Sequence, residues 1–149
     1  MEAKVKGHTY RTAVRWTGEK RGISTAAGKP TLDVATPPEF KGHAGIWSPE
    51  DLFVTAVNAC VMMTFLAFAQ QAGLSLARYE SEAEGQLEFG DGGFQFTTIN
   101  IRPQVLVKPG GDISKAHELM VKAEKYCLVS RSVKSKVTVK ATISEVEGN

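Results

Sequence analysis

Cys60 and Cys127 are the only two cysteines in the sequence, and they are the residues best suited to redox chemistry. A thiolate is a strong nucleophile, whereas a buried thiol usually behaves as a small apolar group. The two cysteines lie far apart in the chain and form no Cys-x-x-Cys pair, which excludes a thioredoxin-type motif. The pair can therefore be catalytic, redox-sensing or inert. Each cysteine falls on the apolar face of an expected helix, as expected if the two helices meet.

Cys60 lies too far inside its helix for the positive N-terminal end to activate it. A thiolate at this position needs a nearby cation, and arginine is the natural choice because it stays charged when buried. Glu50 precedes Cys60 by about ten positions, or roughly 15 Å of helical rise. We therefore expect Glu50 to act on the site only through a long arginine side chain or from a partner subunit.

The three histidines, His8, His43 and His117, show no spacing that is typical of a metal site. His43 lies in the loop 37–47, which also contains two prolines and two glycines and precedes the long helix. It is a candidate auxiliary residue, and a plain connecting role is the alternative. We find no GxSxG, P-loop or GxGxxG motif, and we expect neither a metal nor a bound cofactor.

The segment that must position Cys60 is predicted to be one long helix, residues 49–72. Ser48 and Asp51 resemble a capping box, Pro49 suits the first helical position, and Gly73 suits the residue after the end. The helix is apolar nearly all round, so it must be buried nearly all round. A membrane span is the rival interpretation, but the flanks lack Lys and Arg, and we expect no membrane. A homodimer interface is expected to complete the burial.

The remaining elements predict an α+β protein in which helices cover an antiparallel sheet. Three short strands are expected before the long helix, and a two-stranded hairpin is expected after it. Pro103 in the hairpin's second strand suggests an edge position or a bulge. A second helix begins after Asp112 and has Cys127 on its buried face. The expected strands are 4–16, 21–25, 31–35, 74–89, 94–107 and 135–146.

Length and composition indicate a single domain, residues 1–149, of a soluble globular protein. The net charge is +2, and the basic residues are spread along the chain, so we expect no nucleic-acid partner. The N-terminal residues contain no apolar region typical of a secretory signal. We therefore expect the reducing cytoplasm, where two cysteines do not form a structural disulfide framework.

The chain resembles the OsmC/Ohr family, the osmotically inducible protein C and organic hydroperoxide resistance proteins. Two motifs carry most of the resemblance: SPEDLFVTAVNAC, which ends at Cys60, and AEKYCLVSRSVK, which contains Cys127. The early segment WTGEKRG…STAAGK and the order of elements also match. The resemblance covers nearly the whole chain. It implies an OsmC-like fold, with antiparallel sheets packed on a long central buried helix in an intertwined homodimer with sites at the subunit interface.

The resemblance also implies a thiol-dependent peroxidase that reduces organic hydroperoxides without a metal or bound cofactor. Cys60 would be the peroxidatic thiol and Cys127 the resolving thiol, and an external dithiol would be the reductant. Glu50 matches the family's carboxylate that holds an arginine. Arg21 is the first candidate for that arginine and Arg15 the second, because the loop 37–47 contains no arginine. This chain also has Leu128 where the family often has proline.

Two other functions remain open from the sequence. One is a non-catalytic dimer that binds a small apolar ligand between its subunits. The other is a structural dimer with inert, buried cysteines. Peroxide consumption that depends on Cys60 separates the first hypothesis from both.

Overall fold

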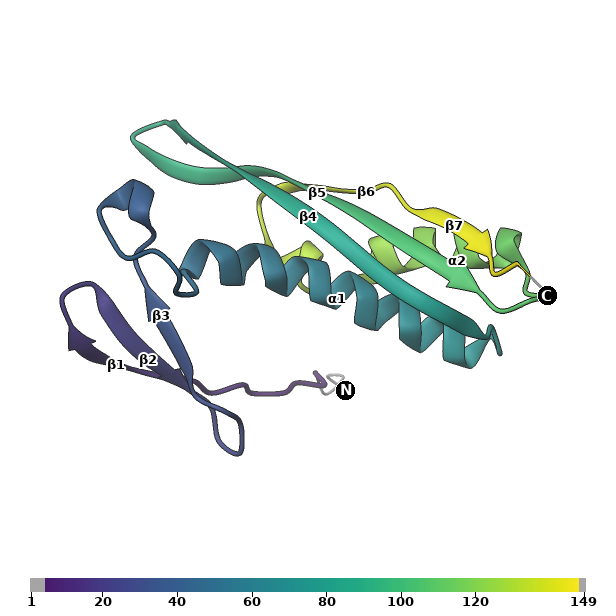
Figure 1. Cartoon of the computed structure of the whole chain (residues 1–149), viewed down its shortest axis with the longest axis horizontal. Helices are drawn as coiled ribbons and strands as arrows, with labels where there is room; N and C mark the ends of the chain where they lie inside the picture. The colour runs from purple at the N-terminus through teal and green to yellow at the C-terminus, as the bar shows by residue number, and fades with distance from the viewer. Residues whose placement is uncertain (1–4, 148–149) are drawn as a thin grey trace. The chain divides into compact units, whose positions relative to one another are not determined.

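The computed structural model describes residues 5–147 and divides the chain into two compact units, residues 1–52 and 53–149 (Figure 1). The boundary falls within the first turn of the long helix. The elements, in chain order, are β1 (Ala13–Gly18), β2 (Arg21–Thr25), β3 (Leu32–Ala35), η1 (Pro38–Phe40), α1 (Pro49–Gln71), β4 (Leu76–Gly90), β5 (Gly93–Val107), α2 (Ile113–Tyr126), η2 (Ser130–Ser132), β6 (Lys136–Val139) and β7 (Thr142–Glu145).

The N-terminal unit is an antiparallel three-stranded sheet in the order β1-β2-β3. The expected strand 4–16 was wrong over residues 5–12, which are not in a strand, and Lys4 lies outside the described residues. Residues before Ala13 have no partner in β2, because the pairing between β1 and β2 ends at Ala13 and Thr25. The predicted loop 37–47 is confirmed apart from the short turn η1 and an isolated β-bridge between Trp47 and Val34.

Helix α1 begins and ends with the signals that the sequence predicts. The Ser48 hydroxyl accepts a hydrogen bond from the Asp51 N–H at 3.1 Å, and the Asp51 carboxylate accepts one from the Ser48 N–H at 3.0 Å. This reciprocal pair is a capping box. At the other end Gly73 has a φ of 70°, and the Leu74 N–H donates to the Ala69 carbonyl. This is the Schellman arrangement, which satisfies carbonyls that the helix leaves free.

Only one stripe of α1 is buried in the single chain. Val57, Val61, Phe65 and Ala69 follow one another at intervals of four and face the core. The expectation that this helix is buried nearly all round was therefore wrong for one chain. Its opposite face contains exposed apolar residues, among them Ala56, Met63 and Ala67. By length and composition alone α1 could also cross a membrane, a test that the core helix of a soluble protein passes too.

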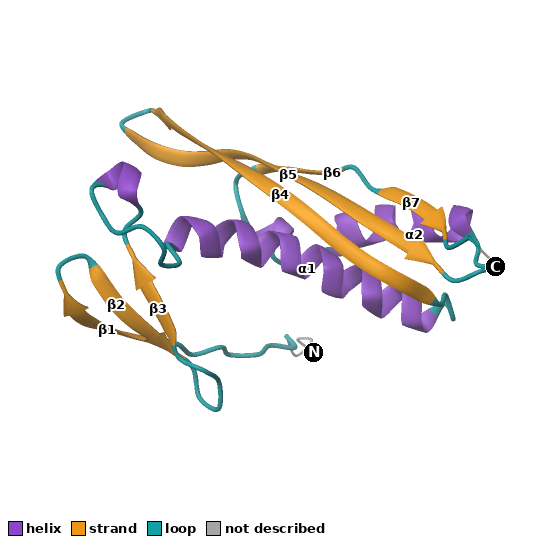
Figure 2. Ribbon diagram, viewed as in Figure 1, coloured by secondary structure: helices purple, strands orange, loops and turns teal. Residues whose placement is uncertain are grey.

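The C-terminal unit is built on the long β4–β5 hairpin, which crosses over α1 with α2 alongside it (Figure 1, Figure 2). The hairpin closes with a two-residue turn, Asp91-Gly92, in which both residues have positive φ. The expected antiparallel strand 135–146 is instead two short strands, β6 and β7, and both pair in parallel with β5. The sheet is mixed because α2 connects β5 to β6. The chain runs back along α2, so β6 and β7 then run in the same direction as β5.

The expected edge position or bulge at Pro103 was also wrong. Strand β5 is central, and Pro103 pairs with Ser81 of β4 on one side. On its other side β6 pairs with residues 98–101 and β7 with residues 104–107. Pro103 therefore lies at the gap between two partner strands, where a residue without an N–H is tolerated.

The core of this unit lies between the sheet and the two helices. It joins the α1 stripe to the inward residues of β5 and to the apolar face of α2, including Ala116, Met120 and Ala123. Asp112 caps α2 by accepting a hydrogen bond from the Lys115 N–H, as predicted. Phe68 of α1 meets Tyr126 of α2 edge to face, with ring centroids 6.3 Å apart. The two helices that carry the cysteines are therefore packed against each other.

Candidate thiol site

The structure brings Cys60 and Cys127 together. Cys60 lies in the middle of α1 on the side that faces α2, and Cys127 is the residue that ends α2. Both belong to the same apolar core, both are free thiols, and their side chains lie within hydrogen-bonding reach of each other. The two residues that the sequence selected for their chemistry therefore form one site, although they come from different helices.

Cys60 is surrounded by hydrogen-bond donors from the turn that follows α2. Burial raises the pKa of the Cys60 thiol, but the hydrogen bonds that it accepts lower it more, so the net pKa lies below the ordinary value. These donors are the backbone of Val129, the side chains of Cys127 and Thr64, and the backbone of Leu128. Hydrogen bonds to a charged group favour its ionised form. These hydrogen bonds, which come from this unit alone, therefore make the Cys60 thiol easier to ionise than an ordinary cysteine.

Cys127 has the opposite character. Burial raises the pKa of its thiol above the ordinary value, and the neighbouring Cys60 raises it further. The Ser130 side chain and backbone lower it only in part. The Cys127 side chain is fully buried. Of the two thiols, Cys60 is therefore the one that ionises more readily, and Cys127 can donate its S–H to the Cys60 thiolate.

Sequence reasoning missed three contributors to this site: Thr64, Val129 and Leu128. The Thr64 hydroxyl lies 3.9 Å from the Cys60 Sγ. Its position four residues after Cys60 on one helix was a usable signal, because such residues share a face. The other two act through backbone N–H groups, which every residue except proline has, so their type gave no signal.

The other predicted site residues lie outside the C-terminal unit. Arg21 is in β2 and Arg15 in β1, and together with Trp16 they line a cavity of about 340 Å³ in the N-terminal unit. Whether Arg21 reaches Cys60 stays a prediction. Glu50 lies in the first turn of α1, and its Oε2 is buried without a hydrogen-bond partner among residues 5–147. The His43 Nε2 lies 3.3 Å from the Glu19 carboxylate, within the N-terminal unit.

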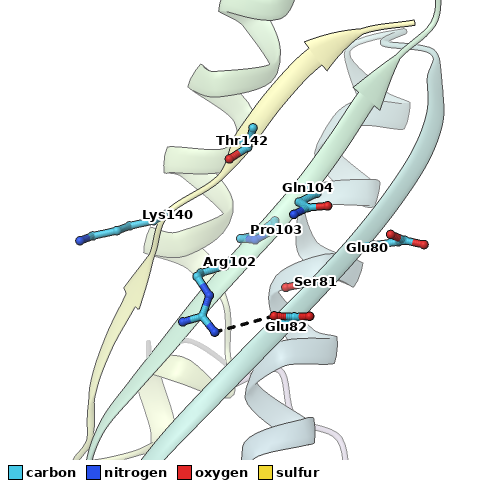
Figure 3. A pocket seen from close by; sticks show the side chains of 8 residues that line it. All are labelled: Glu80, Ser81, Glu82, Arg102, Pro103, Gln104, Lys140 and Thr142. Carbon is cyan, nitrogen blue, oxygen red and sulfur yellow. Dashed lines mark ion pairs between the residues drawn. The ribbon is translucent and has the colours of Figure 1, made fainter.

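A larger cavity, of about 490 Å³, lies on the outer face of the sheet (Figure 3). Arg102 and Gln104 of its lining are exposed residues of β5, Pro103 between them is buried, and neither cysteine lines this cavity. Arg102 is paired there with Glu82 and Glu84, at 3.9 and 3.3 Å, and Lys140 points away from the group (Figure 3). This cavity contains no thiol, and its arginine is already paired with carboxylates.

Among residues 5–147, no three His, Cys, Asp or Glu side chains lie close enough together to share a metal ion. The site is thus a pair of thiols with hydrogen-bond donors aimed at one of them. Such a site can carry out nucleophilic and thiol–disulfide chemistry.

Comparison with known proteins assigns the family. A family model described as OsmC-like protein matches residues 42–142, more than half of the chain. The chain is 30% identical over 129 residues to the peroxiredoxin OsmC of Escherichia coli, which covers 83% of this chain and 89% of that protein. The chain belongs to the OsmC/Ohr family.

Solved structures agree with this assignment. An organic hydroperoxide resistance protein OsmC from Legionella pneumophila superimposes with a TM-score of 0.68 at 25% identity, over 92% of this chain and 97% of that one. An OsmC-like protein of unknown function from Vibrio cholerae gives a TM-score of 0.84 at 19% identity, over 91% and 100%. The second similarity shows the fold alone, which is the α+β OsmC-like fold.

Proposed function

We propose that this protein is a thiol-dependent peroxidase that reduces organic hydroperoxides. The observation that supports the proposal is the contact between Cys60, a thiol whose pKa is lowered by hydrogen bonds, and a second thiol, Cys127, in one core. The names of two relatives, a peroxiredoxin and an organic hydroperoxide resistance protein, support the same class of activity. The apolar surroundings of Cys60 favour an alkyl substrate over hydrogen peroxide.

The reaction follows from the order of the two thiol pKa values. The Cys60 thiolate attacks the terminal oxygen of the hydroperoxide, the O–O bond breaks, and the alkoxide takes a proton and leaves as the alcohol. Cys60 is then a sulfenic acid. Cys127 sulfur attacks the Cys60 sulfur, and the hydroxyl leaves as water with the Cys127 proton. An external dithiol reduces the resulting disulfide by exchange and restores both thiols.

A homodimer belongs to the same proposal. The exposed face of α1, with Ala56, Met63 and Ala67, is apolar, and a second copy of this chain would cover it. The unpaired oxygen of Glu50 needs a cation, and Arg21 or Arg15 of one of the two copies would supply it. That guanidinium would then add to the stabilisation of the thiolate. The protein would work in a reducing cytoplasm, without a bound cofactor.

The experiment is peroxide consumption by the purified protein with an external dithiol, comparing an alkyl hydroperoxide with hydrogen peroxide. We expect the alkyl substrate to be consumed faster. Cys60→Ser should abolish consumption. Cys127→Ser should permit one turnover and then accumulate Cys60 in oxidised form, visible by mass spectrometry as a sulfenic acid or its trapped adduct. Unchanged consumption by Cys60→Ser would refute the proposal.

Two controls separate the remaining alternatives. Saturable binding of an apolar ligand with no peroxide consumption would support the non-catalytic dimer instead. Light scattering on a size-exclusion column tests the homodimer, with Met63→Glu as the disrupting variant and Val121→Glu, on exposed α2 surface, as its control. A monomeric wild-type protein would contradict the dimer but would leave the thiol chemistry intact.

A further inference from the structure

Thr64 makes two contacts with the same residue, Cys60. Its hydroxyl donates a hydrogen bond to the Cys60 carbonyl at 2.7 Å, one turn earlier in α1. The same oxygen lies 3.9 Å from the Cys60 Sγ, within the range for a hydrogen bond to sulfur. Many helical threonines make the first contact, but the second depends on the cysteine.

The single hydroxyl hydrogen cannot serve both contacts at once. While it lies on the Cys60 carbonyl, the oxygen offers only lone pairs to the sulfur, so the neutral Cys60 must donate its S–H to Thr64. A thiolate has no hydrogen to donate, and two lone pairs would then face a negative sulfur. The charged form is stabilised only if the hydroxyl turns and donates to sulfur, which leaves the carbonyl with its ordinary helical hydrogen bond from the backbone.

We propose that the Thr64 hydroxyl is a two-position switch that follows the ionisation of Cys60. In the thiol form its hydrogen lies on the Cys60 carbonyl, and it holds the Cys60 S–H. In the thiolate form the thiol proton has passed to solvent, and the hydroxyl hydrogen lies on the sulfur. Thr64 thus becomes a determinant of thiol reactivity. Its catalytic consequence rests on the proposed function, whereas the switch itself does not.

The other groups around Cys60 leave this role to Thr64. From α2, the titratable group that faces it is Cys127, which holds its own proton. Lys122 and Lys125 on the same helix lie over the rings of Phe68 and Tyr126, at 4.3 and 5.3 Å. Arg131 of η2 is an exposed side chain. On α1, Thr64 is the residue with a side-chain hydroxyl in contact with the sulfur.

The test is the rate of iodoacetamide alkylation of Cys60 as a function of pH, read peptide by peptide with mass spectrometry. Thr64→Val keeps the side-chain shape and removes the hydroxyl, and Thr64→Ser keeps the hydroxyl. At a pH below the wild-type midpoint, we expect Thr64→Val to slow alkylation about tenfold, because a hydrogen bond to a charged group is lost. We expect Thr64→Ser to stay within about threefold of the wild type.

A merely structural role for Thr64 would not give this pattern. An unchanged alkylation profile in Thr64→Val, or equal loss in Thr64→Ser, would overturn the proposal. If Thr64→Val does not fold, judged by circular dichroism, Thr64→Ala is held to the same criteria. The S–H stretching band of Cys60 gives a second readout, and removal of Thr64 should shift it to higher frequency. Alkylation requires no peroxide. The role of Thr64 can therefore be tested even if the protein proves to have no peroxidase activity.

Discussion

The two sides of α1 carry buried polar groups in different states. On the side that faces α2, the backbone donors of Val129 and Leu128 are directed at the sulfur of Cys60, and the Thr64 hydroxyl lies 3.9 Å from it. On the side that faces β4, polar atoms of Asn58, Tyr79 and Ser81 are buried without a hydrogen-bond partner of standard geometry among the described residues. The first side places hydrogen-bond donors around one thiol, whereas on the second side the polar atoms line a cavity of about 190 Å³.

This difference predicts that the two sides separate in experiment. Changes on the β4 side should alter stability and leave the reactivity of Cys60 unchanged. Changes on the α2 side should alter reactivity and leave stability nearly unchanged. The predictions that follow run from the largest expected effect to the smallest.

Phe65→Ala should lower the free energy of unfolding by about 3–5 kcal/mol, because it empties a fully buried site. Phe65 lies in the stripe between the two sides, where its ring contacts that of Tyr79 at 5.8 Å. Denaturant titration measures the loss. The matched control is Val121→Ala, because Val121 is 67% exposed on α2 and lies outside the proposed dimer face. A small change in the free energy of unfolding for Phe65→Ala would show that the buried stripe of α1 contributes little to the stability of the core.

Gly85→Ala should cost about 1–3 kcal/mol, because the added methyl has no room. A Cβ at this position of β4 would lie 2.6 Å from the Val54 methyl of α1 and 2.9 Å from the Phe96 ring. The alkylation profile of Cys60 should not change. Gly93→Ala is the control for the change from glycine to alanine without a clash, because a Cβ at Gly93 would meet no atom within 4 Å. A change in Cys60 reactivity here would break the separation of the two sides.

Leu128→Pro should slow alkylation of Cys60 a few-fold at a pH below its midpoint, because proline removes one N–H donor. Cys127 has an extended backbone, with ψ of 113°, which is the conformation that a residue before proline adopts. Leu128→Ala keeps the N–H and serves as the control. Equal effects of the two variants would assign the change to the lost side chain and not to the lost donor.

Tyr79→Phe should change stability at neutral pH by less than about 1 kcal/mol, because it removes a hydroxyl that has no standard partner. Burial raises the pKa of Tyr79 to about 12, an effect that the nearby Ser81 hydroxyl partly offsets. The folded state therefore keeps this proton longer than the unfolded chain does. Its stabilising contribution is complete below the unfolded pKa and is lost as the pH rises through about 12. Thermal unfolding should show a shallower alkaline decline in Tyr79→Phe.

The sequence predicted most of the elements because their signals are local. Ser48, Asp51 and Gly73 marked both ends of α1, and the glycines after Phe89 marked the turn of the hairpin. It failed where distant pairing decides the outcome. The split of the last strand into β6 and β7, their parallel direction and the central place of Pro103 depend on how the chain returns from α2 to β5.

The candidate site divides in the same way. Residue type and rarity selected Cys60 and Cys127, and the sequence by itself determined that any thiol chemistry must use them. Only the tertiary structure decided which thiol has the lower pKa, because that depends on which sulfur receives the N–H groups of the turn after α2. Those donors belong to the backbone, and they act on Cys60 only once α1 and α2 are packed together. The sequence states which side chains are present, whereas only the fold determines which distant residue a backbone N–H group is directed at.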